Sequence, residues 1–509
     1  MTFTRHSLDQ RIVTAATLLF VCGFVTNAAA APDVPASSAD LIIDGQQAVE
    51  GFGNAVAFIG DVDGDGCDDF AVGAPGFDIG FEQYIAGRVD VYSGKTGELV
   101  WSVVGTPGFD GFGDILGWSL APIGDLDGDG VGDVIIGAIG TIETDNHEHV
   151  YVHSGATGQR IATLLVGHAG SNKDFGWSVS SAGDVTGDGL DDILAGAPKA
   201  GVTLPNGALV SGGAVYLFDG ASFALIHTFE GQASGDRMGE SVAGGVDVNG
   251  DGVSDIAVGA NSAGDFGEVS LYSGSTLALL HTIEGSADPF IQGVGDSIVM
   301  LKDSRSPGCA KVLVGAPYSF SGSNFFGGAP LFDVCDRSAS PLHIFFAEEA
   351  GGGLGRSSHQ AGDVDGDGVT DFLVADPGFG DPGRTYLFSG ATFQLLMTFT
   401  GENFFDVFGY GVSGGGDANG DGTPDILVGA RFNDSAGADS GRAYVFYTPS
   451  SICVADLNSD GVVNGADLAS LLAQWQALGS SPADLTADNV VDGADLSQLL
   501  ANWGPCNTQ

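Results

Sequence analysis

The sequence predicts a mainly β protein: a seven-bladed β-propeller followed by a small α-helical domain. Three observations support this. Aspartate-rich loops recur along the chain, with starts 54 to 64 residues apart. Short apolar runs bounded by Gly, Pro and Asp surround each loop, which is typical of strands joined by turns. Beyond residue 453 two acidic loops are instead followed by apolar residues at helical spacing.

Each repeat contains the same four apolar runs around its acidic loop. In unit three, residues 175–178 precede the loop, and residues 193–198, 214–220 and 225–231 follow it. A four-stranded unit cannot bury both of its faces alone, so neighbouring units must stack and the ring must close. Residues 303–311 are a decayed copy of the loop, which brings the predicted number of units to seven. The other loops begin at Asp61, Asp125, Asp184, Asp247, Asp363 and Asp417.

The closure of the ring is predicted from a missing strand. The last unit stops at Pro449 without a fourth run, whereas Leu41 to Gly45 form a spare run before the first unit. We expect this N-terminal run to pair with the last unit and cover an edge that would otherwise invite aggregation.

The acidic loops have the spacing of calcium ligands. Side-chain oxygens at positions 1, 3, 5 and 9, with a backbone carbonyl at position 7, match the first nine positions of a calcium loop, and glycine at position 6 permits the turn. Three loops carry aspartate at all four side-chain positions and predict the strongest sites. The predicted ligands are Asp61, Asp63, Asp65, Cys67 and Asp69; Asp125, Asp127, Asp129, Val131 and Asp133; Asp184, Thr186, Asp188, Leu190 and Asp192; Asp247, Asn249, Asp251, Val253 and Asp255; Asp363, Asp365, Asp367, Val369 and Asp371; and Asp417, Asn419, Asp421, Thr423 and Asp425.

Two alternatives to calcium fit the acidic loops less well. Magnesium prefers an octahedral shell with several waters, so a flexible all-oxygen loop favours the larger ion. Solvated Asp-Gly turns would not repeat the same spacing six times, and clustered carboxylates repel one another without a cation. In unit five, Pro307 and Lys311 occupy positions 5 and 9, so no divalent ion is expected there. Cys309 and Cys335 occur in this unit and either form a disulfide or stay as buried thiols.

The combination of Phe-Gly, acidic hairpin and Gly-Ala-Pro resembles the FG-GAP repeat of integrin α-chain propellers. The resemblance covers about residues 39–448. It implies a seven-bladed propeller with calcium in hairpins on one face and ligand binding at loops on the other. Met238-Gly239, Val294-Gly295 and Leu354-Gly355 replace Phe-Gly, and Ala375-Asp376-Pro377 replaces Gly-Ala-Pro, which alters packing more than topology.

After a linker at residues 449–452, residues 453–509 form a second module. Two acidic loops 28 residues apart each lead into a helix, a pattern that resembles a dockerin type I domain. The resemblance implies two further calcium sites, about eight in all, and a cohesin-like partner; a generic calcium-folded stalk is the alternative. Cys453 and Cys506 flank the module and could join its ends. The predicted ligands are Asp456, Asn458, Asp460, Val462, Asn464 and Asp467, then Asp484, Thr486, Asp488, Val490, Asp492 and Asp495.

In dockerins, positions 10, 11, 17 and 18 of each repeat contact the partner. The two sets are nearly identical, so one partner surface could be met in either orientation. The corresponding residues are Gly465, Ala466, Leu472 and Ala473, then Gly493, Ala494, Leu500 and Ala501.

The N-terminus and the net charge indicate where the protein is located and which partners are excluded. Residues 1–31 have a charged start, a short apolar run and small residues before Pro32, which predicts a signal peptide and a secreted protein. The apolar run is shorter than a membrane span, which makes an anchored form the weaker alternative. The chain has 65 Asp and Glu against 16 Lys and Arg, a net charge of −49. This balance excludes nucleic acid and anionic membranes as partners.

Most residues that match enzyme motifs are explained by the repeat. Ser413 lies in a G-x-S-x-G pattern, but the same serine recurs in other units and is a strand position, so no catalytic residue is assigned. His147, His149 and His153 lie close in sequence and could bind a transition metal. The sequence favours an extracellular binding or adhesion module tethered to a cohesin-like or cell-surface partner. The alternative is a component of a polysaccharide-degrading assembly with glycoside hydrolase or carbohydrate-binding activity.

Overall fold

The chain is mainly β, with two short helices near its C-terminus among the described residues. The predicted signal peptide lies outside these residues except for Ala31. The computed structural model describes residues 31–80, 85–107, 112–140, 148–166, 174–287, 290–302, 310–321, 324–334, 340–347, 352–378, 382–449, 455, 457, 462–477, 481, 483, 485, 490–501 and 503–505.

The strands follow the predicted units, each an antiparallel group of four, and a parallel pair between the third strand of unit one and the first strand of unit two joins these two units into one sheet. In chain order they are β3 (Val56–Gly60), β4 (Asp69–Ala74), β5 (Ile85–Tyr92) and β6 (Leu99–Val104); β7 (Phe112–Ile123), β8 (Asp133–Ala138), β9 (His149–His153) and β10 (Arg160–Leu164); β11 (Val179–Gly183), β12 (Asp192–Ala197), β15 (Ala214–Phe218) and β16 (Leu225–Glu230); and β17 (Met238–Val246), β18 (Asp255–Ala260), β19 (Glu268–Tyr272) and β20 (Leu279–Glu284).

The remaining units continue the pattern, with short hairpins added in the connecting loops. The units are β23 (Ile298–Lys302), β24 (Ala310–Val314), β27 (Gly328–Asp333) and β28 (His343–Phe346); β29 (Ser357–Gly362), β30 (Asp371–Asp376), β31 (Arg384–Phe388) and β32 (Leu395–Thr400); and β33 (Phe408–Gly416), β34 (Asp425–Ala430) and β35 (Arg442–Phe446). The added hairpins are β13 (Gly201–Thr203) with β14 (Leu209–Ser211), β21 (Ser286–Ala287) with β22 (Phe290–Ile291), and β25 (Phe320–Ser321) with β26 (Asn324–Phe325).

The position of a strand in its unit explains its sequence. Second strands such as β4 and β8 are buried at every residue because neighbouring sheets cover both of their faces. They are therefore short continuous apolar runs. The fourth strands, such as β6, lie at the outer edge and are only partly covered. Their apolar residues are accordingly interspersed with exposed ones.

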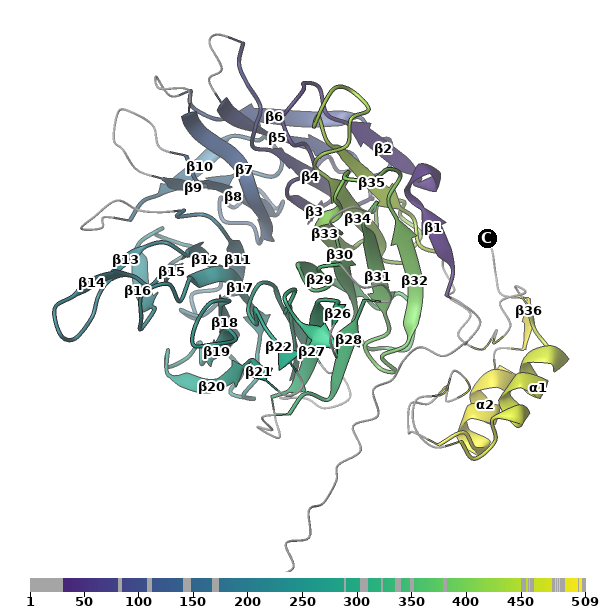
Figure 1. The fold of residues 1–509 in the computed structure, drawn as a ribbon. Coiled ribbons are helices and arrows are strands. Elements are labelled where there is room, and N and C mark those ends of the chain that lie inside the picture. Colours follow the sequence, from purple (N-terminus) through teal and green to yellow (C-terminus); the bar gives the residue numbers. More distant parts are fainter. Residues whose placement is uncertain are drawn as a thin grey trace, which may run out of the picture.

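The hydrophobic core lies between adjacent sheets rather than within one layer. Unit two packs on unit three through residues such as Ile135 and Tyr216, and each later unit packs on the next in the same way. The last unit returns to the first, where Leu427 of β34 shares a buried cluster with Phe70 of β4. Figure 1 shows the sheets following one another around a centre, so that the green last sheet lies beside the purple first one. This arrangement fits a β-propeller, although no hydrogen-bonded sheet closes on itself.

The predicted use of the spare N-terminal run is confirmed. Strand β2 (Leu41–Asp44) pairs antiparallel with β35, with Leu41 opposite Val445, and supplies the fourth strand of the last unit. The preceding residues also take part, which the predicted boundary at residue 39 did not anticipate. Strand β1 (Asp33–Pro35) pairs parallel with β32, and a short 3-10 helix, Ala36–Ser38, connects β1 towards β2.

Adjacent sheets approach most closely at paired glycines. A Cβ built on Gly196 of the Gly-Ala-Pro run would lie 2.3 Å from the carbonyl oxygen of Gly239, the Met-Gly glycine of the next unit. The equivalent contact between the last and first units joins Gly429 and Gly53, at 2.0 Å. These positions must be glycine because a side chain would collide with backbone.

The recurring serine reinforces this contact. The prediction that it is a strand position is confirmed for Ser119 and Ser413, whereas Ser178 lies one residue before its strand. The serine hydroxyl donates to the carbonyl of the glycine in the next unit, at 2.7 Å from Ser119 to Gly176 and 3.0 Å from Ser178 to Gly239. In the last unit the Ser413 hydroxyl instead accepts from the backbone N–H of Phe58, at 3.2 Å. The serine therefore links neighbouring sheets.

The C-terminal segment contains two helices, as its spacing predicted. Helix α1 (Gly465–Ala473) and helix α2 (Gly493–Ala501) pack through their own buried cluster, which includes Leu471 and Leu499. Strand β36 (Val462–Val463) pairs with β37 (Gly504–Pro505) and brings the two ends of the segment together. Cys453 and Cys506, proposed to form a bridge at these ends, lie outside the described residues.

We predict that Gly196→Ala destabilises the protein. The added methyl group would meet the Gly239 carbonyl, and relieving the clash would push two sheets apart, which costs about 1–3 kcal/mol. Chemical denaturation measures the loss. Gly353→Ala is the matched control, because a Cβ there meets nothing within 4 Å. Equal stabilities of the two variants would contradict the proposed role of the glycine contact.

Candidate metal-binding loops

Three acidic loops bring carboxylates together, and they are the three that carry aspartate at all four side-chain positions. In each, one oxygen from position 1, one from position 3 and one from position 9 all lie within 4.8 Å of one another. Such a cluster could hold a metal ion. The clusters consist of Asp61, Asp63 and Asp69; Asp125, Asp127 and Asp133; and Asp363, Asp365 and Asp371.

The position 9 aspartate has a structural role that sequence reasoning missed. Asp69 opens strand β4 and is fully buried. Its Oδ2 accepts from the backbone N–H groups of Val62 and Asp63 at 2.8 and 3.2 Å, and its Oδ1 accepts from that of Gly94 at 3.0 Å. The carboxylate thus ties the acidic loop to the turn between the third and fourth strands.

The same tie is present in the other acidic loops. The turn partner is Gly155 for Asp133, Gly220 for Asp192, Gly274 for Asp255, Gly390 for Asp371 and Thr448 for Asp425. A Cβ on Gly220 would lie 2.0 Å from the carbonyl oxygen of Asp191, so the turn is pressed against the loop. The signal in the sequence was a glycine that recurs after the third run, 19 to 28 residues beyond position 9.

Burial places the position 9 aspartates in an unfavourable electrostatic setting. Burial, followed by the nearby charge of Asp365, raises the pKa of Asp371 to about 7. Burial also raises the pKa of Asp425 to about 7 and those of Asp69 and Asp133 to about 6. A buried carboxylate that resists ionisation near neutral pH is stabilised as an anion by a nearby cation.

Position 1 differs because backbone N–H groups converge on it. Asp61 Oδ1 accepts from Gly64 and Asp65 at 2.7 and 3.1 Å, and its Oδ2 accepts from Gly66 at 2.9 Å. In the second loop such donors, with Gly130 the strongest, lower the pKa of Asp125. In the second loop the backbone therefore favours the anionic form of Asp125.

Position 5 does not join the cluster in any of the three loops. Asp65 Oδ1 accepts from the backbone N–H of Cys67 at 3.0 Å, and Asp129 and Asp367 accept from Val131 and Val369 at 2.8 Å. The structure thus brings together three of the four carboxylates expected in each loop. Cys67 at position 7 is a buried free thiol, and burial raises its pKa.

The loops with a neutral residue at position 3 do not form such a cluster among the described residues. In unit four, the Asn249 side-chain amide donates to Asp255 Oδ1 at 3.0 Å. The Asn419 amide donates to Asp421 Oδ2 at 3.3 Å. The amide hydrogens satisfy carboxylate oxygens that would otherwise face a cation. In unit three, Thr186 donates its backbone N–H to Asp192 Oδ2 at 2.9 Å.

Other predicted sites are only partly within the described residues. In unit five the loop at 303–309 and Cys335 lie outside them, whereas Lys311 is the second residue of strand β24, with its ammonium 5.7 Å from the ring centre of Phe393. In the tail, Asp456, Asn458, Asp460, Asp484, Thr486 and Asp488 lie outside them. Asp467 and Asp495 are buried, and each accepts from the backbone N–H three residues before it.

The histidine group does not form a metal site among the described residues. His149 and His153 lie on one face of β9, but the Tyr151 ring stands between them, with centroid distances of 5.4 and 6.2 Å. His153 Nδ1 contacts the Gly158 carbonyl at 2.8 Å, and burial lowers its pKa. His147 lies outside the described residues.

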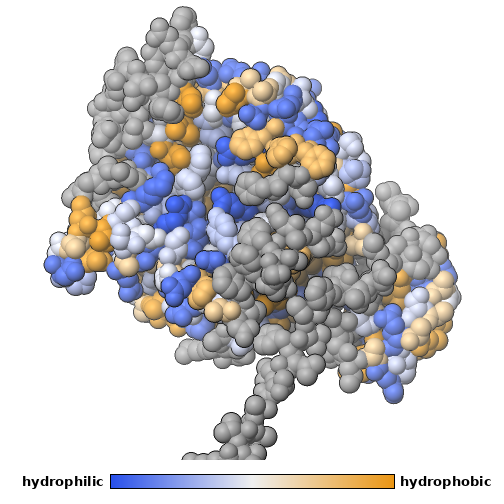
Figure 2. Space-filling view, in the orientation of Figure 1, coloured by the Kyte–Doolittle hydropathy of each residue, from blue (hydrophilic) through white to orange (hydrophobic). Residues whose placement is uncertain are grey.

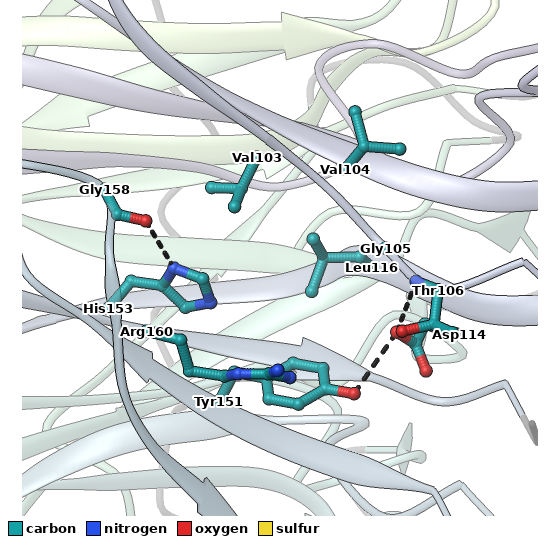
Figure 3. Close-up of a pocket in the computed structure, with 10 residues that line it drawn as sticks. All are labelled: Val103, Val104, Gly105, Thr106, Asp114, Leu116, Tyr151, His153, Gly158 and Arg160. Atoms are coloured by element: carbon teal, nitrogen blue, oxygen red, sulfur yellow. Dashed lines mark hydrogen bonds between the residues drawn. The ribbon is translucent and has the colours of Figure 1, made fainter.

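A pocket of about 210 Å³ lies between the first two units, near the histidines. Figure 3 shows its polar groups engaged with one another: Asp114 accepts from the Thr106 N–H at 2.6 Å and from the Tyr151 hydroxyl at 3.2 Å, and Arg160 lies along the Tyr151 ring. Its lining contains one carboxylate, Asp114. Glycoside hydrolysis generally uses a pair of carboxyl groups, so this pocket does not support that chemistry.

The all-aspartate loops fit a divalent cation. Their oxygens converge, position 9 is buried as an acid of raised pKa, and Asp363 Oδ1 is buried without a hydrogen-bond partner among the described residues. Hard oxygen donors are the ligands that calcium prefers. The chemistry of these donors is charge neutralisation and cross-linking of the loop.

Comparisons with known proteins agree with this architecture. Four stretches match the FG-GAP repeat. They are residues 52–92, 175–218, 238–272 and 408–446. Each begins at the Phe-Gly or Met-Gly position and ends with the third strand, so it contains one acidic loop. Together with the integrin-α relatives, these matches support an integrin-like β-propeller.

The curated relatives include several integrin α chains. Integrin alpha-PS2 of Drosophila melanogaster is 30% identical over 40% of this chain and 15% of its own length. Integrin alpha-E of Mus musculus is 35% identical over 30% of this chain and 14% of its own, and integrin alpha-V of Gallus gallus is 26% identical over 56% and 23%. The chain thus spans less than a quarter of these relatives.

Among solved structures, the chain is similar to a crystal structure of BBS1N in complex with ARL6DN, soaked with lead. The TM-score is 0.49 at 10% identity, covering 81% of this chain and 96% of that one.

We predict that the metal-free protein loses stability as the pH rises through 4 to 7. A carboxyl whose folded-state pKa is raised contributes stability below its unfolded pKa, and this contribution is lost as pH passes the folded pKa, here about 7 for Asp371. In the presence of chelator, the free energy of unfolding of Asp371→Asn relative to that of the wild type should therefore increase by about 2–4 kcal/mol between pH 4 and pH 7. Urea denaturation at each pH measures the difference.

Calcium supplies the control. A cation bound at the loop favours the carboxylate, so saturating calcium should abolish or reverse the pH trend of the wild type. A pH-independent difference between wild type and Asp371→Asn in chelator would contradict the assignment of the buried acid.

Proposed function

We propose that this chain is a secreted, calcium-stabilised binding module: a seven-bladed propeller that presents loops to an extracellular ligand and is tethered through a dockerin-like tail. The proposal rests on the recurrence of FG-GAP repeats, together with the carboxylates that converge in the acidic loops of units one, two and six. A scaffold held by cations at one end leaves the loops at the other end free for recognition.

The topology separates the two ends of each sheet. The acidic loop joins strands one and two, and its position 9 aspartate is bonded to the turn between strands three and four. Both connections therefore lie at the same end. The loops between strands two and three and between successive units lie at the opposite end, which we name the loop face. An extracellular setting suits this design because calcium is abundant there, and the predicted signal peptide supports export.

The tail has features of a docking surface. Leu472 and Trp475 of the first repeat are 50% and 39% exposed, and their counterparts Leu500 and Trp503, 28 residues on, are 52% and 48% exposed. Exposed large apolar residues repeated by the same interval support two equivalent partner surfaces. We propose a cohesin-like protein or a cell-surface component as the partner.

A polysaccharide-degrading role remains the second candidate, favoured by the dockerin-like tail alone. Release of reducing sugars from polysaccharides by the purified protein, abolished by substitution of acids outside the loops, would support it. A glycan array read beside this assay separates binding from hydrolysis.

We predict that calcium binds the folded chain and stabilises it. Elemental analysis of protein prepared in millimolar calcium should find bound calcium, and chelator should lower the melting temperature, because a ligand present at 100 times its Kd adds about 2.7 kcal/mol per site. Asp63→Asn, Asp127→Asn and Asp365→Asn combined should lower both the calcium content and the shift. Substitution of the exposed Asp439 by Asn is the control. Absence of bound calcium would refute the proposal.

We also predict that the two tail surfaces act as alternatives. Leu472→Glu or Leu500→Glu alone should leave capture of a partner from the secreted fraction nearly intact, because the other surface remains. The double variant should lose capture by at least tenfold, since a buried interface leucine becomes an unpaired charge. Leu209→Glu, at an exposed leucine of a propeller hairpin, is the control. Full capture by the double variant would contradict the tail assignment.

No helix among the described residues combines the length and apolar character needed to cross a membrane.

A further inference from the structure

Arg431 occupies an unusual position on the loop face. It follows strand β34, and its guanidinium lies between two rings, 4.6 Å from the Tyr410 centroid and 4.7 Å from that of Phe432. One guanidinium nitrogen donates to Asn54 Oδ1 at 2.6 Å. This hydrogen bond joins the last unit to the first. The Nε of Arg431 is buried and has no hydrogen-bond partner in the described part of the chain. The side chain is thus held rigidly.

The charge of Arg431 is not neutralised by a carboxylate among the described residues, unlike that of other loop-face cations. Arg356 pairs with Asp296 at 3.1 Å and Lys199 with Asp174 at 2.6 Å. Arg237 pairs with Glu240 at 2.7 Å. In a chain with a net charge of −49, an arginine that contacts only aromatic rings and a neutral amide is poised to accept an external anion. Its planar fork matches a carboxylate.

Exposed aromatic rings adjoin this cation. Phe404 and Phe405 are 66% and 67% exposed, and Phe432 is 38% exposed. The backbone N–H of Phe432 donates to the Asp406 carbonyl at 3.2 Å, so the two loops that carry these rings are joined. Figure 2 shows apolar side chains gathered on the surface beside the last sheet. We name Tyr410, Arg431, Phe432, Phe404 and Phe405 together the Arg431 patch.

The backbone holds these rings outward under strain. Phe405 and Val407 have φ of 71° and 58°, a left-handed conformation that bulky residues seldom adopt. Asp406 between them is buried and accepts from the side chains of Asn403 and Asn433 at 3.1 and 2.7 Å. A buried polar anchor thus maintains two exposed phenylalanines, an arrangement that folding alone would not favour.

We propose that the Arg431 patch binds an acidic, apolar peptide segment of a partner protein. A ligand Asp or Glu carboxylate pairs with Arg431, and a neighbouring apolar side chain covers the phenylalanines. A glycan fits less well, because the nearby Asn403, Asn433 and Asp406 bond to one another and leave few groups for sugar hydroxyls. This inference rests on the proposed function, since it takes the chain to be a binding module and names its partner class.

The test uses the full-length protein in millimolar calcium and an array of short synthetic peptides. Each peptide places Asp or Glu beside Phe, Leu or Trp, and each has a twin with Asn or Gln in place of the acid. We expect acidic peptides to bind and their amide twins to bind at least tenfold more weakly. Arg431→Gln should remove this preference, and Phe404→Ser with Phe405→Ser should weaken binding at least tenfold.

Matched variants control for folding and for charge. Arg160→Gln removes another arginine that lies along a tyrosine ring, 4.9 Å from the Tyr151 centroid, and should leave peptide binding unchanged. Leu209→Ser removes an exposed apolar residue elsewhere. Because Phe404 and Phe405 are exposed, their variant should keep the melting temperature of the wild type even if Arg431→Gln lowers it.

The outcomes distinguish this inference from the wider proposal. Absence of peptide binding, equal binding of acid and amide twins, or unchanged binding by both patch variants would overturn it. Binding to a glycan array that Arg431→Gln abolishes would also overturn it, while leaving the chain a binding module. Failure to bind peptides and glycans alike, together with absence of bound calcium, would overturn both.

Discussion

The structure depends on how closely neighbouring sheets can approach. Each sheet has two apolar faces, and each face is buried only by the next sheet, so the core is a series of interfaces around a centre. The paired glycines allow backbone to meet backbone at these interfaces, and the serine hydroxyl satisfies the glycine carbonyl that the approach would otherwise leave unbonded. Larger residues at either glycine would separate the sheets and open the core.

The acidic loops fix one end of each sheet. The position 9 aspartate does so by accepting hydrogen bonds from backbone N–H groups, whether position 3 is Asp, Asn or Thr. Where position 3 is also Asp, three carboxylates converge and could hold a metal ion as well. In those loops the position 9 aspartate combines its structural role with a proposed metal-binding one.

Most of the architecture could be predicted from the sequence, because the spacing of apolar residues and the local composition indicate which residues are buried. The fully covered second strands, the half-covered fourth strands and the spare N-terminal run were all legible as patterns. What could not be predicted depends on contacts between residues far apart in the chain. The bond from Asp69 to Gly94, the turn of Asp65 away from its neighbours, and the meeting of Arg431 with Asn54 leave no local signature. Strand β1 was not predicted because three residues are too few to show an alternating apolar and polar pattern.

The pairing of β2 with β35 joins residues near opposite ends of the propeller segment, with Leu41 opposite Val445. Such a contact closes a very long loop and must form late, after nearly the whole segment has been synthesised. During synthesis the first sheets have one face uncovered, which exposes the nascent chain to aggregation. Once formed, the same strand acts as a clasp: unfolding requires it to detach first, which favours slow unfolding.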